Sequence, residues 1–451
     1  MNASPVPFPE ALRTWTRIGL LSFGGPAGQI AVMHRTLVEE KRWISEERFL
    51  HALNYCMLLP GPEAQQLATY IGWLLHGARG GLVAGTLFVL PGFLAIMAFS
   101  VVYATWGQHP IVAGIFLGLK AAVIAIVIQA LLRIGRRALR STVARWVAAL
   151  AFIGLALLRV SFPLVVVIAG LFGFLWTRFG RREFTAAGNS HASGAALAPP
   201  ALVPESALNQ VAPSAKRALK LLALWLPLWL APVAALALIV GPTHVYTQVG
   251  LFFSKMAVVT FGGAYAVLTY VAQQAADHFG WVTPTQMLDG LGLAESTPGP
   301  LIMVVQFVGF LAAYQAAGIP HPLLAGLFAA CLTVWVTFVP CFLWIFLGAP
   351  YVESLRKYEP LSGALAAITA AVVGVIANLA LWFALHALFA HVTPHALTRW
   401  LHVDVPELSS VHWVLVLLTA LALTMTFALK WSLPRNLVVC GALGVGFTLL
   451  A

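Results

Sequence analysis

Residues 23–62 read FGGPAGQIAVMHRTLVEEKRWISEERFLHALNYCMLLPGP, and residues 261–300 read FGGAYAVLTYVAQQAADHFGWVTPTQMLDGLGLAESTPGP. Each residue of the second stretch lies 238 positions after its counterpart, and nine of the 40 aligned positions are identical. The identical positions include both Phe-Gly-Gly and both Pro-Gly-Pro tripeptides. A repeat whose matching positions are helix-breaking residues is typical of a transporter core.

The composition indicates a multi-spanning membrane protein. Hydrophobic residues make up 60% of the 451 residues and charged residues only 9%. The net charge of +11 resides mostly in short loops between apolar runs, where basic residues orient spans, so we expect no nucleic-acid partner. The four cysteines show no CxxC spacing, so neither a disulfide nor a metal framework is expected. The first apolar run carries Arg13 and Arg17, and we expect no cleavable signal peptide.

The apolar runs predict an all-α polytopic protein with about thirteen transmembrane segments. Two six-element repeats with broken helices are expected at residues 1–177 and 246–451. Between them we expect a flexible cytoplasmic linker at 178–218, rich in Ala, Ser and Pro, and a linking transmembrane helix at 219–245. The run 12–34 is interrupted at its Phe-Gly-Gly-Pro, so it is either a span or a re-entrant hairpin.

The positions of arginine residues predict the orientation of the repeats. One cluster follows the fourth span and another follows the sixth span, so both lie on one side; their members are Arg133, Arg136, Arg137, Arg140, Arg145, Arg178, Arg181 and Arg182. With both clusters in the cytoplasm, the N-terminus is cytoplasmic and the C-terminus is periplasmic. An odd number of spans precedes the second copy, which predicts an inverted-topology repeat.

The helix breakers predict an anion site. Ser45 and Thr283 are good N-caps for helices that run toward each Pro-Gly-Pro, and new helices begin after those tripeptides. The first turn of each new helix exposes unpaired backbone N–H groups and the positive end of the helix dipole. The glycines of each Phe-Gly-Gly let a second backbone segment approach closely. The alternative is that both tripeptides are only kinks or close-packing contacts.

Few ionisable residues lie within apolar runs. Arg17 and Lys255 lie six residues before the two Phe-Gly-Gly tripeptides, and they are candidates either for attracting an anion or for snorkelling to an interface. Lys120 lies in mid-span, where the other repeat has Thr369. We expect Lys120 to be the anion's counter-charge; the alternative is a structural pair with a carboxylate.

Two glutamates lie beside the Pro-Gly-Pro tripeptides. Glu63 directly follows the first and Glu295 precedes Ser296-Thr297 and the second, so both are candidates for proton coupling, although Glu63 also suits a helix first turn. Ser296 and Thr297 can donate hydroxyls to an oxyanion, and Gln66 supplies an amide. The histidines show no ligand spacing with a carboxylate, so we expect no metal site and no cofactor.

Three of these motifs resemble those of a known family. The residues 23–31 (FGGPAGQIA), 59–73 (LPGPEAQQLATYIGW) and 296–310 (STPGPLIMVVQFVGF) resemble those of long-chain members of the chromate ion transporter family. The resemblance implies export of chromate across the bacterial inner membrane, coupling to the proton motive force, and chromate resistance. The motif residues that it carries over are Phe23, Gly24, Gly25, Pro60, Gly61, Pro62, Glu63, Gln66, Phe261, Gly262, Gly263, Pro298, Gly299 and Pro300.

The expected function is therefore secondary transport of a tetrahedral divalent oxyanion by alternating access, with the lipid bilayer as surroundings. Sulfate shares the charge and shape of chromate, so sulfate or another oxyanion is an alternative main substrate. A membrane enzyme acting on lipid phosphates is a further alternative, but it needs clustered catalytic groups, and the carboxylates near the breakers are isolated. The sequence does not give an oligomeric state, so a homodimer is one of the possible assemblies.

Overall fold

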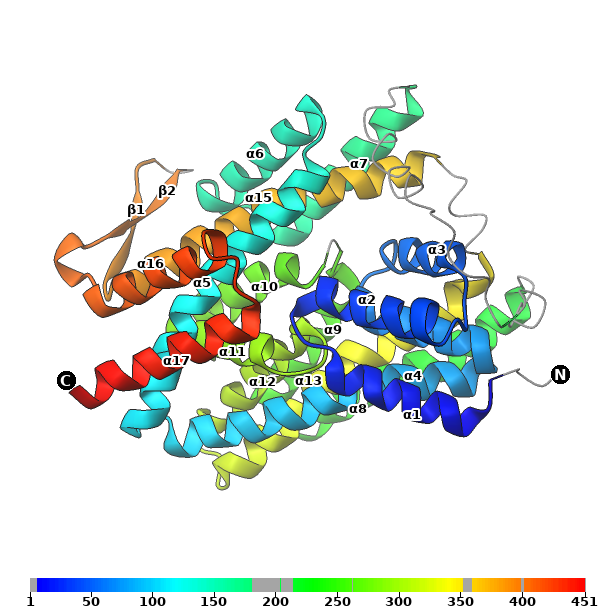
Figure 1. Cartoon of the computed structure of the whole chain (residues 1–451), viewed down its shortest axis with the longest axis horizontal. Helices are drawn as coiled ribbons and strands as arrows, with labels where there is room; N and C mark the ends of the chain where they lie inside the picture. Colours follow the sequence, from blue (N-terminus) through cyan, green and yellow to red (C-terminus); the bar gives the residue numbers. More distant parts are fainter. Residues whose placement is uncertain are drawn as a thin grey trace. The chain divides into compact units, whose positions relative to one another are not determined.

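The computed structural model describes residues 6–180, 203, 214–261, 263–351, 359–398 and 401–450. These residues are mainly helical, and the helices begin where local chemistry favours a start (Figure 1). Proline occupies the first turn of α1 (Phe8–Leu21), α5 (Pro110–Ala138), α7 (Phe162–Arg178) and α13 (Pro322–Gly348), where its missing N–H costs nothing. Serine side chains cap α3 (Glu46–Cys56), α6 (Thr142–Ala156) and α8 (Ala215–Ile239).

The chain forms two compact units, and each takes segments from both halves of the sequence. Unit 1 lies within Met1–Ala98, His191–Ala264 and Thr297–Tyr358, and unit 2 within Phe99–Ser190, Tyr265–Ser296 and Glu359–Ala451. These units are defined by contacts in space, whereas the predicted domains are continuous stretches of the sequence. The division into two sequence repeats with a linker therefore stays a prediction. Most of the predicted linker, residues 181–202 and 204–213, lies outside the described residues.

Within the described residues, six helices are long and apolar enough to cross a membrane: α4 (Glu63–Trp106), α5, α8, α13, α15 (Glu359–Leu388) and α17 (Leu433–Leu450). Shorter apolar helices include α6, α7, α9 (Val245–Val259) and α16 (Trp413–Phe427). The chain is therefore an all-α multi-pass membrane protein, as predicted, but the count of thirteen spans is not confirmed.

The run 12–34 is a helical hairpin and not one spanning helix. Its two helices, α1 with 14 residues and α2 (Gly25–His34) with 10, are each shorter than the roughly 20 residues that a bilayer crossing needs. A π-helix, η1 (Arg35–Glu40), continues α2, and Lys41 Nζ then lies 2.8 Å from Glu10 Oε1 in the first turn of α1. The chain therefore returns to where it began, which supports the re-entrant interpretation.

Helix α4 also reverses direction. His76 and Gly77 are not helical, and Gly77 has φ 61° and ψ −153°, a conformation open to glycine. A β-carbon on Gly72 would overlap the carbonyl oxygen of Gly80, so the segments before and after the break pack against each other. The first segment ends near the N-terminus of α1, where His76 Nε2 lies 2.8 Å from the carbonyl oxygen of Val6.

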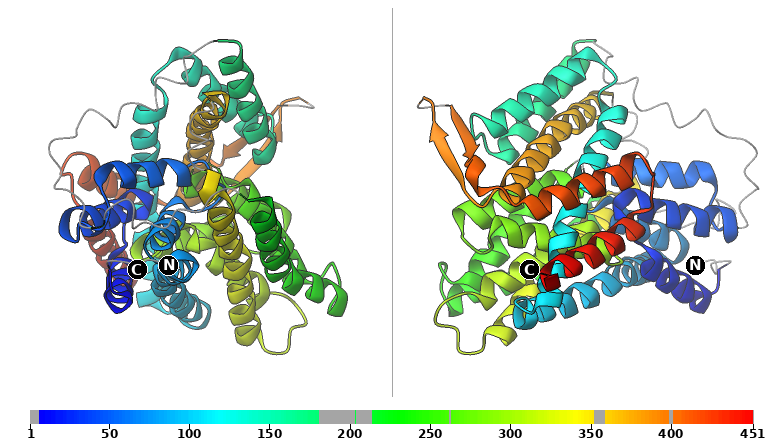
Figure 2. Two further views of the ribbon diagram at one scale, coloured as in Figure 1. Left: turned by 90° about the vertical axis from the view of Figure 1, so that its right-hand side faces the viewer. Right: turned by 60° about the vertical axis from the view of Figure 1, so that its left-hand side comes forward.

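In unit 2, small residues allow close helix packing. Helices α6 and α7 flank α15 (Figure 2), and β-carbons on Gly173 or Gly374 would overlap the backbone of their neighbours, Gly363 and Ala148. Helices α5 and α17 approach in the same way, because a β-carbon on Gly118 would overlap a backbone carbonyl of α17. Close approach of backbones through small residues is the usual packing of membrane helices.

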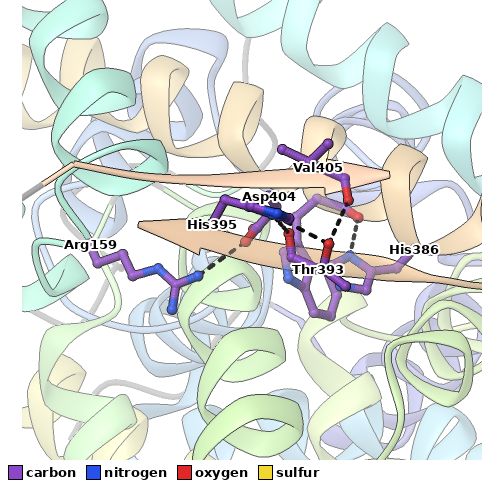
Figure 3. Close-up of polar contacts among 7 residues, drawn as sticks. Arg159, His386, Thr393, His395, Asp404 and Val405 are labelled. Atoms are coloured by element: carbon purple, nitrogen blue, oxygen red, sulfur yellow. Dashed lines mark hydrogen bonds and ion pairs between the residues drawn. The ribbon is translucent and has the colours of Figure 1, made fainter. Parts of the chain in front are cut away.

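A β-hairpin follows α15 in unit 2. Strands β1 (Val392–Ala396) and β2 (His402–Pro406) pair antiparallel, with Thr393 opposite Val405. Arg159, in the turn between α6 and α7, donates to Asp404 at 3.1 Å (Figure 3). The N–H of His402 also donates to the carbonyl of Leu157 at 2.9 Å, so the hairpin is held at the end of the α6–α7 pair.

The remaining elements are short or complete the second repeat. They are α10 (Ala264–Gln273), the π-helix η3 (Gln274–His278), α11 (Pro284–Ser296), η4 (Leu301–Met303), α12 (Val304–Tyr314), η5 (Ala349–Tyr351) and η6 (Leu408–Ser410). The two copies of the repeated stretch share unusual local features. Each has a π-helix followed by a positive φ, 52° at Arg42 and 63° at Gly280.

Candidate functional site

Both Phe-Gly-Gly tripeptides form tight breaks between two short helices. The N–H of Phe23 donates to the carbonyl of Leu21 at 3.0 Å, and the N–H of Phe261 donates to that of Val259 at 3.1 Å. Gly24 and Gly25 have positive φ, 81° and 70°, as does Gly263 with 95°. Gly262, the remaining predicted member, lies outside the described residues. The glycines are therefore needed for the backbone conformation of these breaks.

Both Pro-Gly-Pro tripeptides end one helix and start the next, as predicted. After Pro62 the chain enters α4 at Glu63, and after Pro300 it enters η4 and then α12. Gly61 and Gly299 have φ of 123° and 97°. The predicted caps of the preceding helices are also confirmed: the Ser45 hydroxyl accepts from the Arg48 N–H at 3.2 Å, and the Thr283 hydroxyl accepts from the Gln286 N–H at 3.1 Å.

In unit 1, the two repeats exchange equivalent hydrogen bonds. The N–H of Gly61 donates to the carbonyl of Thr260 at 2.8 Å, and the N–H of Gly299 donates to the carbonyl of Ser22 at 2.9 Å. Gly299 and Thr260 lie 238 positions after Gly61 and Ser22, so the two bonds are the same bond made twice. Each Pro-Gly-Pro is therefore attached to the residue just before the other repeat's Phe-Gly-Gly.

Two further contacts tie these tripeptides together. The Gln29 side chain of α2, which is buried, donates from Nε2 to the carbonyl of Gly299 at 2.6 Å. A β-carbon on Gly263 would lie 3.8 Å from Glu63 Oε1, so the second Phe-Gly-Gly faces the carboxyl at the start of α4. Gln29 was not among the predicted site residues. It lies four residues after Gly25, the first residue of α2, and this closeness to the Phe-Gly-Gly break could have marked it as a candidate.

Buried amides surround these helix starts. Gln66 Nε2 donates to the carbonyl of Pro60 at 2.7 Å, and Gln306 Nε2 donates to that of Phe93 at 3.0 Å. Within the described residues the Oε1 atoms of both glutamines are buried without a hydrogen-bond partner. Buried polar atoms normally have partners, so these two acceptors indicate a place that a polar ligand or water can occupy. Thr297, just before the second Pro-Gly-Pro, is also buried in unit 1.

Glu63 is a carboxyl at a helix start. It is the first residue of α4, and the part of the chain that the structure describes offers its side chain neither a cation nor a hydrogen-bond donor. The first backbone N–H of α4 that makes a helical hydrogen bond is that of Gln66, which donates to the carbonyl of Pro62 at 3.1 Å. The N–H groups of the turn before it have no intrahelical partner, so they can bind an anion or Glu63 itself.

Lys120 belongs to unit 2 and has a carboxylate partner there. Its Nζ lies 3.4 Å from Oδ1 of Asp289 on α11. This pair corresponds to the alternative that the sequence left open for Lys120, and its role as a counter-charge to substrate stays a prediction. Asp289 was not selected from the sequence, although an acid within an otherwise apolar stretch, Leu288–Leu293, was a signal.

Glu295 and Ser296 also belong to unit 2. Glu295 is buried and accepts a short hydrogen bond from the Tyr265 hydroxyl on its Oε1, while its Oε2 has no partner among the described residues. Ser296 donates to the carbonyl of Leu293 at 2.9 Å, within its own helix. Glu295 thus keeps an open oxygen, whereas the hydroxyl of Ser296 is already engaged in local structure.

The two basic residues before the Phe-Gly-Gly tripeptides lie at the surface. Arg17 pairs with Glu40 at 3.3 Å, and 57% of its side chain is exposed. Lys255 is exposed as well. Within the described residues, no group of three or more His, Cys, Asp and Glu side chains is arranged to hold a metal ion. The site's positive character therefore comes mainly from two helix starts, each worth about half a charge.

Comparison with known proteins agrees with this geometry. The family model described as "Chromate transporter" matches residues 9–174 and 247–447. A chromate transport protein of Pseudomonas aeruginosa is 34% identical over 82% of this chain and 80% of its own length. Another from Cupriavidus metallidurans is 26% identical over 95% of this chain and 90% of its own. A probable chromate transport protein of Synechococcus elongatus is 28% identical over 80% of this chain and 81% of its own.

No solved structure matches the chain. The family match falls in two blocks that together cover most of the sequence, and each block contains one Phe-Gly-Gly and one Pro-Gly-Pro. The matched family is a transporter family, which points away from enzymatic activity. The chain belongs to the chromate transporter family.

Proposed function

We propose that this protein exports chromate from the cytoplasm by alternating access and so confers chromate resistance. The observation that carries the proposal is the exchanged pair of hydrogen bonds, Gly61 to Thr260 and Gly299 to Ser22. These bonds hold two helix starts in equivalent settings within unit 1, beside the buried side chains of Gln66 and Gln306. Two such starts are a known way to bind an anionic group between repeats.

We further propose the predicted orientation, with a cytoplasmic N-terminus and a periplasmic C-terminus in the inner membrane. If residues 8–41 and 45–76 each enter and return on one side, the first half keeps four crossing segments: the part of α4 after Gly77, α5, α6 and α7. Helix α8 adds a fifth. The number before the second copy stays odd, so the second repeat is still inverted.

Unit 2 supports this topology for the second copy. Burial raises the pKa of Asp277, in η3, and the charges of His386, Asp404 and Arg159 also act on its carboxyl. Asp404 lies in strand β2 and pairs with Arg159, and His386 lies in the last turn of α15, which precedes the hairpin (Figure 3). The chain after α10 therefore lies on the side of the hairpin, as expected if the second Phe-Gly-Gly also belongs to a re-entrant segment.

Glu63 and Glu295 are our candidates for proton coupling. Oε2 of Glu295 is buried and has no partner among the described residues. Glu63 is half-buried, and the described residues offer its side chain neither a cation nor a hydrogen-bond donor. An isolated buried carboxylate is costly, so binding a proton is favoured when no cation is near. Glu63 is also next to the N–H groups that an oxyanion needs. Its negative charge and a bound dianion exclude each other unless Glu63 is protonated.

The proposal is tested by flux measurements in proteoliposomes. Chromate and sulfate movement is followed while a pH gradient and a membrane potential are imposed separately. We expect outward-directed chromate flux that responds to both. Equal rates for sulfate would assign a broader tetrahedral oxyanion substrate, and no flux of either anion above that of empty liposomes would overturn the proposal.

A further inference from the structure

A buried ion pair in unit 2 joins helices α5 and α11. Lys120 Nζ lies 3.4 Å from Asp289 Oδ1, and the Tyr103 hydroxyl donates to Asp289 Oδ2 at 2.9 Å. The repeat does not supply this pair twice. The counterpart of Asp289 in the first copy is His51, and the counterpart of Lys120 is Thr369, which bonds to its own helix at Leu365. The pair therefore occurs once in the repeated structure, which suggests a role that the equivalent position of the other repeat does not share.

The pair is incompletely satisfied. Oδ2 of Asp289 has its tyrosine donor, but Oδ1 has no hydrogen bond among the described residues, and Lys120 is its only ionic contact there. Burying two charges removes both from water, and a pair 3.4 Å apart does not offset that loss fully. Such a pair is therefore a poor stabilising device, and its two members can be separated at less cost than those of a tight, fully hydrogen-bonded pair.

The two members differ in access. The Lys120 side chain is 20% exposed and that of Asp289 only 4%. The ammonium group is therefore the more accessible member of the pair. The exposed member is a cation, and a small anion is the ligand that fits it.

We propose that Asp289 holds Lys120 while substrate is absent and yields it to the oxyanion, taking up a proton in exchange. The inference rests on the proposed transport of an oxyanion. One proton from the solvent enters as one oxyanion binds, and the only bond formed is the O–H bond of the protonated Asp289 carboxyl. With Lys120 turned to the anion, Asp289 keeps only the neutral tyrosine, so its buried carboxylate is left without a counter-charge and binds a proton.

Within the described residues, the groups that act on Asp289 are Lys120 from α5 and Tyr103 from α4. Helix α15 also packs against α11, but its titratable residues, Glu359 and His386, lie near its two ends. The remaining basic residue near α11 is Arg133 of α5, whose charge acts on Glu295. The proton uptake is therefore assigned to Asp289.

The test measures protons and anion binding together on the purified full-length chain. Sulfate is added to protein in a weakly buffered solution, binding is followed by calorimetry, and proton uptake is followed with a pH indicator. We expect at least about one proton per bound sulfate in the native chain. In Asp289→Asn we expect about one proton fewer per bound sulfate, and sulfate binding at least about tenfold tighter, because the competing carboxylate is gone.

Two further variants keep the test decisive if Asp289→Asn folds poorly. Tyr103→Phe keeps both charges but removes a donor from the carboxylate, so sulfate binding should persist to higher pH than in the native chain. Thr369→Ala, at the matched position of the other repeat, should behave like the native chain. An unchanged pH profile in Tyr103→Phe, or proton uptake in a folded Asp289→Asn that equals that of the native chain, would overturn the inference.

The outcomes also separate this inference from the proposed function. If the native chain binds neither sulfate nor chromate, the transport proposal itself is wrong. If it binds the anion without taking up a proton, the transport proposal stands and the exchange at Lys120 is refuted.

Discussion

Gly61 and Gly299 hold a backbone conformation that other residues adopt only with strain. Their φ angles are 123° and 97°. A β-carbon on Gly61 would lie 2.8 Å from Gln66 Nε2 and 2.9 Å from Cys341 Sγ, and one on Gly299 would lie 3.0 Å from the backbone of Gly92. These two glycines also donate the bonds that the repeats exchange, so space, conformation and hydrogen bonding all depend on them.

We expect Gly61→Ala and Gly299→Ala to lower chromate export by about tenfold or more, because small shifts of binding groups cost that much. Each substitution also costs about 1–2 kcal/mol in backbone strain. Gly446→Ala is the matched control, since no atom lies near its added β-carbon. Export and thermal unfolding are measured together. Normal export by Gly61→Ala would show that this tripeptide does not position substrate.

Glu63 is the carboxyl placed directly at a candidate anion-binding helix start. A glutamine there has the same shape but cannot take up a proton. We expect Glu63→Gln to bind chromate but to lose the dependence of flux on an imposed pH gradient. Glu47→Gln, at an exposed position in the first turn of α3, serves as control. A pH-gradient response equal to that of the native chain would remove Glu63 from the coupling mechanism.

Lys120 gives a further test of charge balance. Loss of its ammonium group leaves the buried Asp289 of unit 2 without a counter-charge and removes the cation that our proposal assigns to the oxyanion. We expect Lys120→Ala to abolish chromate export while the protein is still made and inserted. Expression is checked by quantitative blotting of membranes beside the flux assay. Full export by this variant would show that neither substrate nor Asp289 needs the ammonium group.

Among the helices, the short hairpins are the basis for our proposal that residues 8–41 and 45–76 are re-entrant. Lys41 returns to Glu10, and His76 returns to Val6, so two successive segments of unit 1 begin and end close together. Helices of 14 and 10 residues extend only about 21 and 15 Å, less than the roughly 30 Å of hydrocarbon. Breaks at this depth need partners for their backbone, and the exchanged hydrogen bonds supply them.

This arrangement predicts which side residues 47 and 79 face. Single cysteines in place of Glu47 and Arg79, both exposed, are introduced after the four native cysteines have been replaced. An impermeant maleimide should label both from the same side of the membrane. If 12–34 were instead a full span and 61–78 another, the two cysteines would be labelled from opposite sides.

In the whole molecule, neither half of the sequence corresponds to a compact unit. Unit 1 contains the first 98 residues together with segments of the second half, and it brings both Pro-Gly-Pro tripeptides together. The exchanged hydrogen bonds cross between the halves. Each half alone therefore lacks partners for its buried helix starts, and such unsatisfied groups are costly in a membrane.

We expect the two halves, expressed as separate chains divided between Pro200 and Ala201, to be unstable alone and to restore export when co-expressed. Co-purification through a tag on one half is the measurement, and the tagged half alone is the control. A stable and active single half would show that the interleaved arrangement is not required.

The spacing of the Phe-Gly-Gly and Pro-Gly-Pro tripeptides was enough to predict the helix breaks and the new helix starts, because proline and glycine act through their own backbone chemistry. Apolar composition likewise predicted an all-α membrane protein. The reversals at Gly24 and Gly77, the exchanged bonds of Gly61 and Gly299, and the Lys120–Asp289 pair could not be derived in this way. Each depends on residues distant in the chain, and their proximity results from packing of the whole chain and not from local preference.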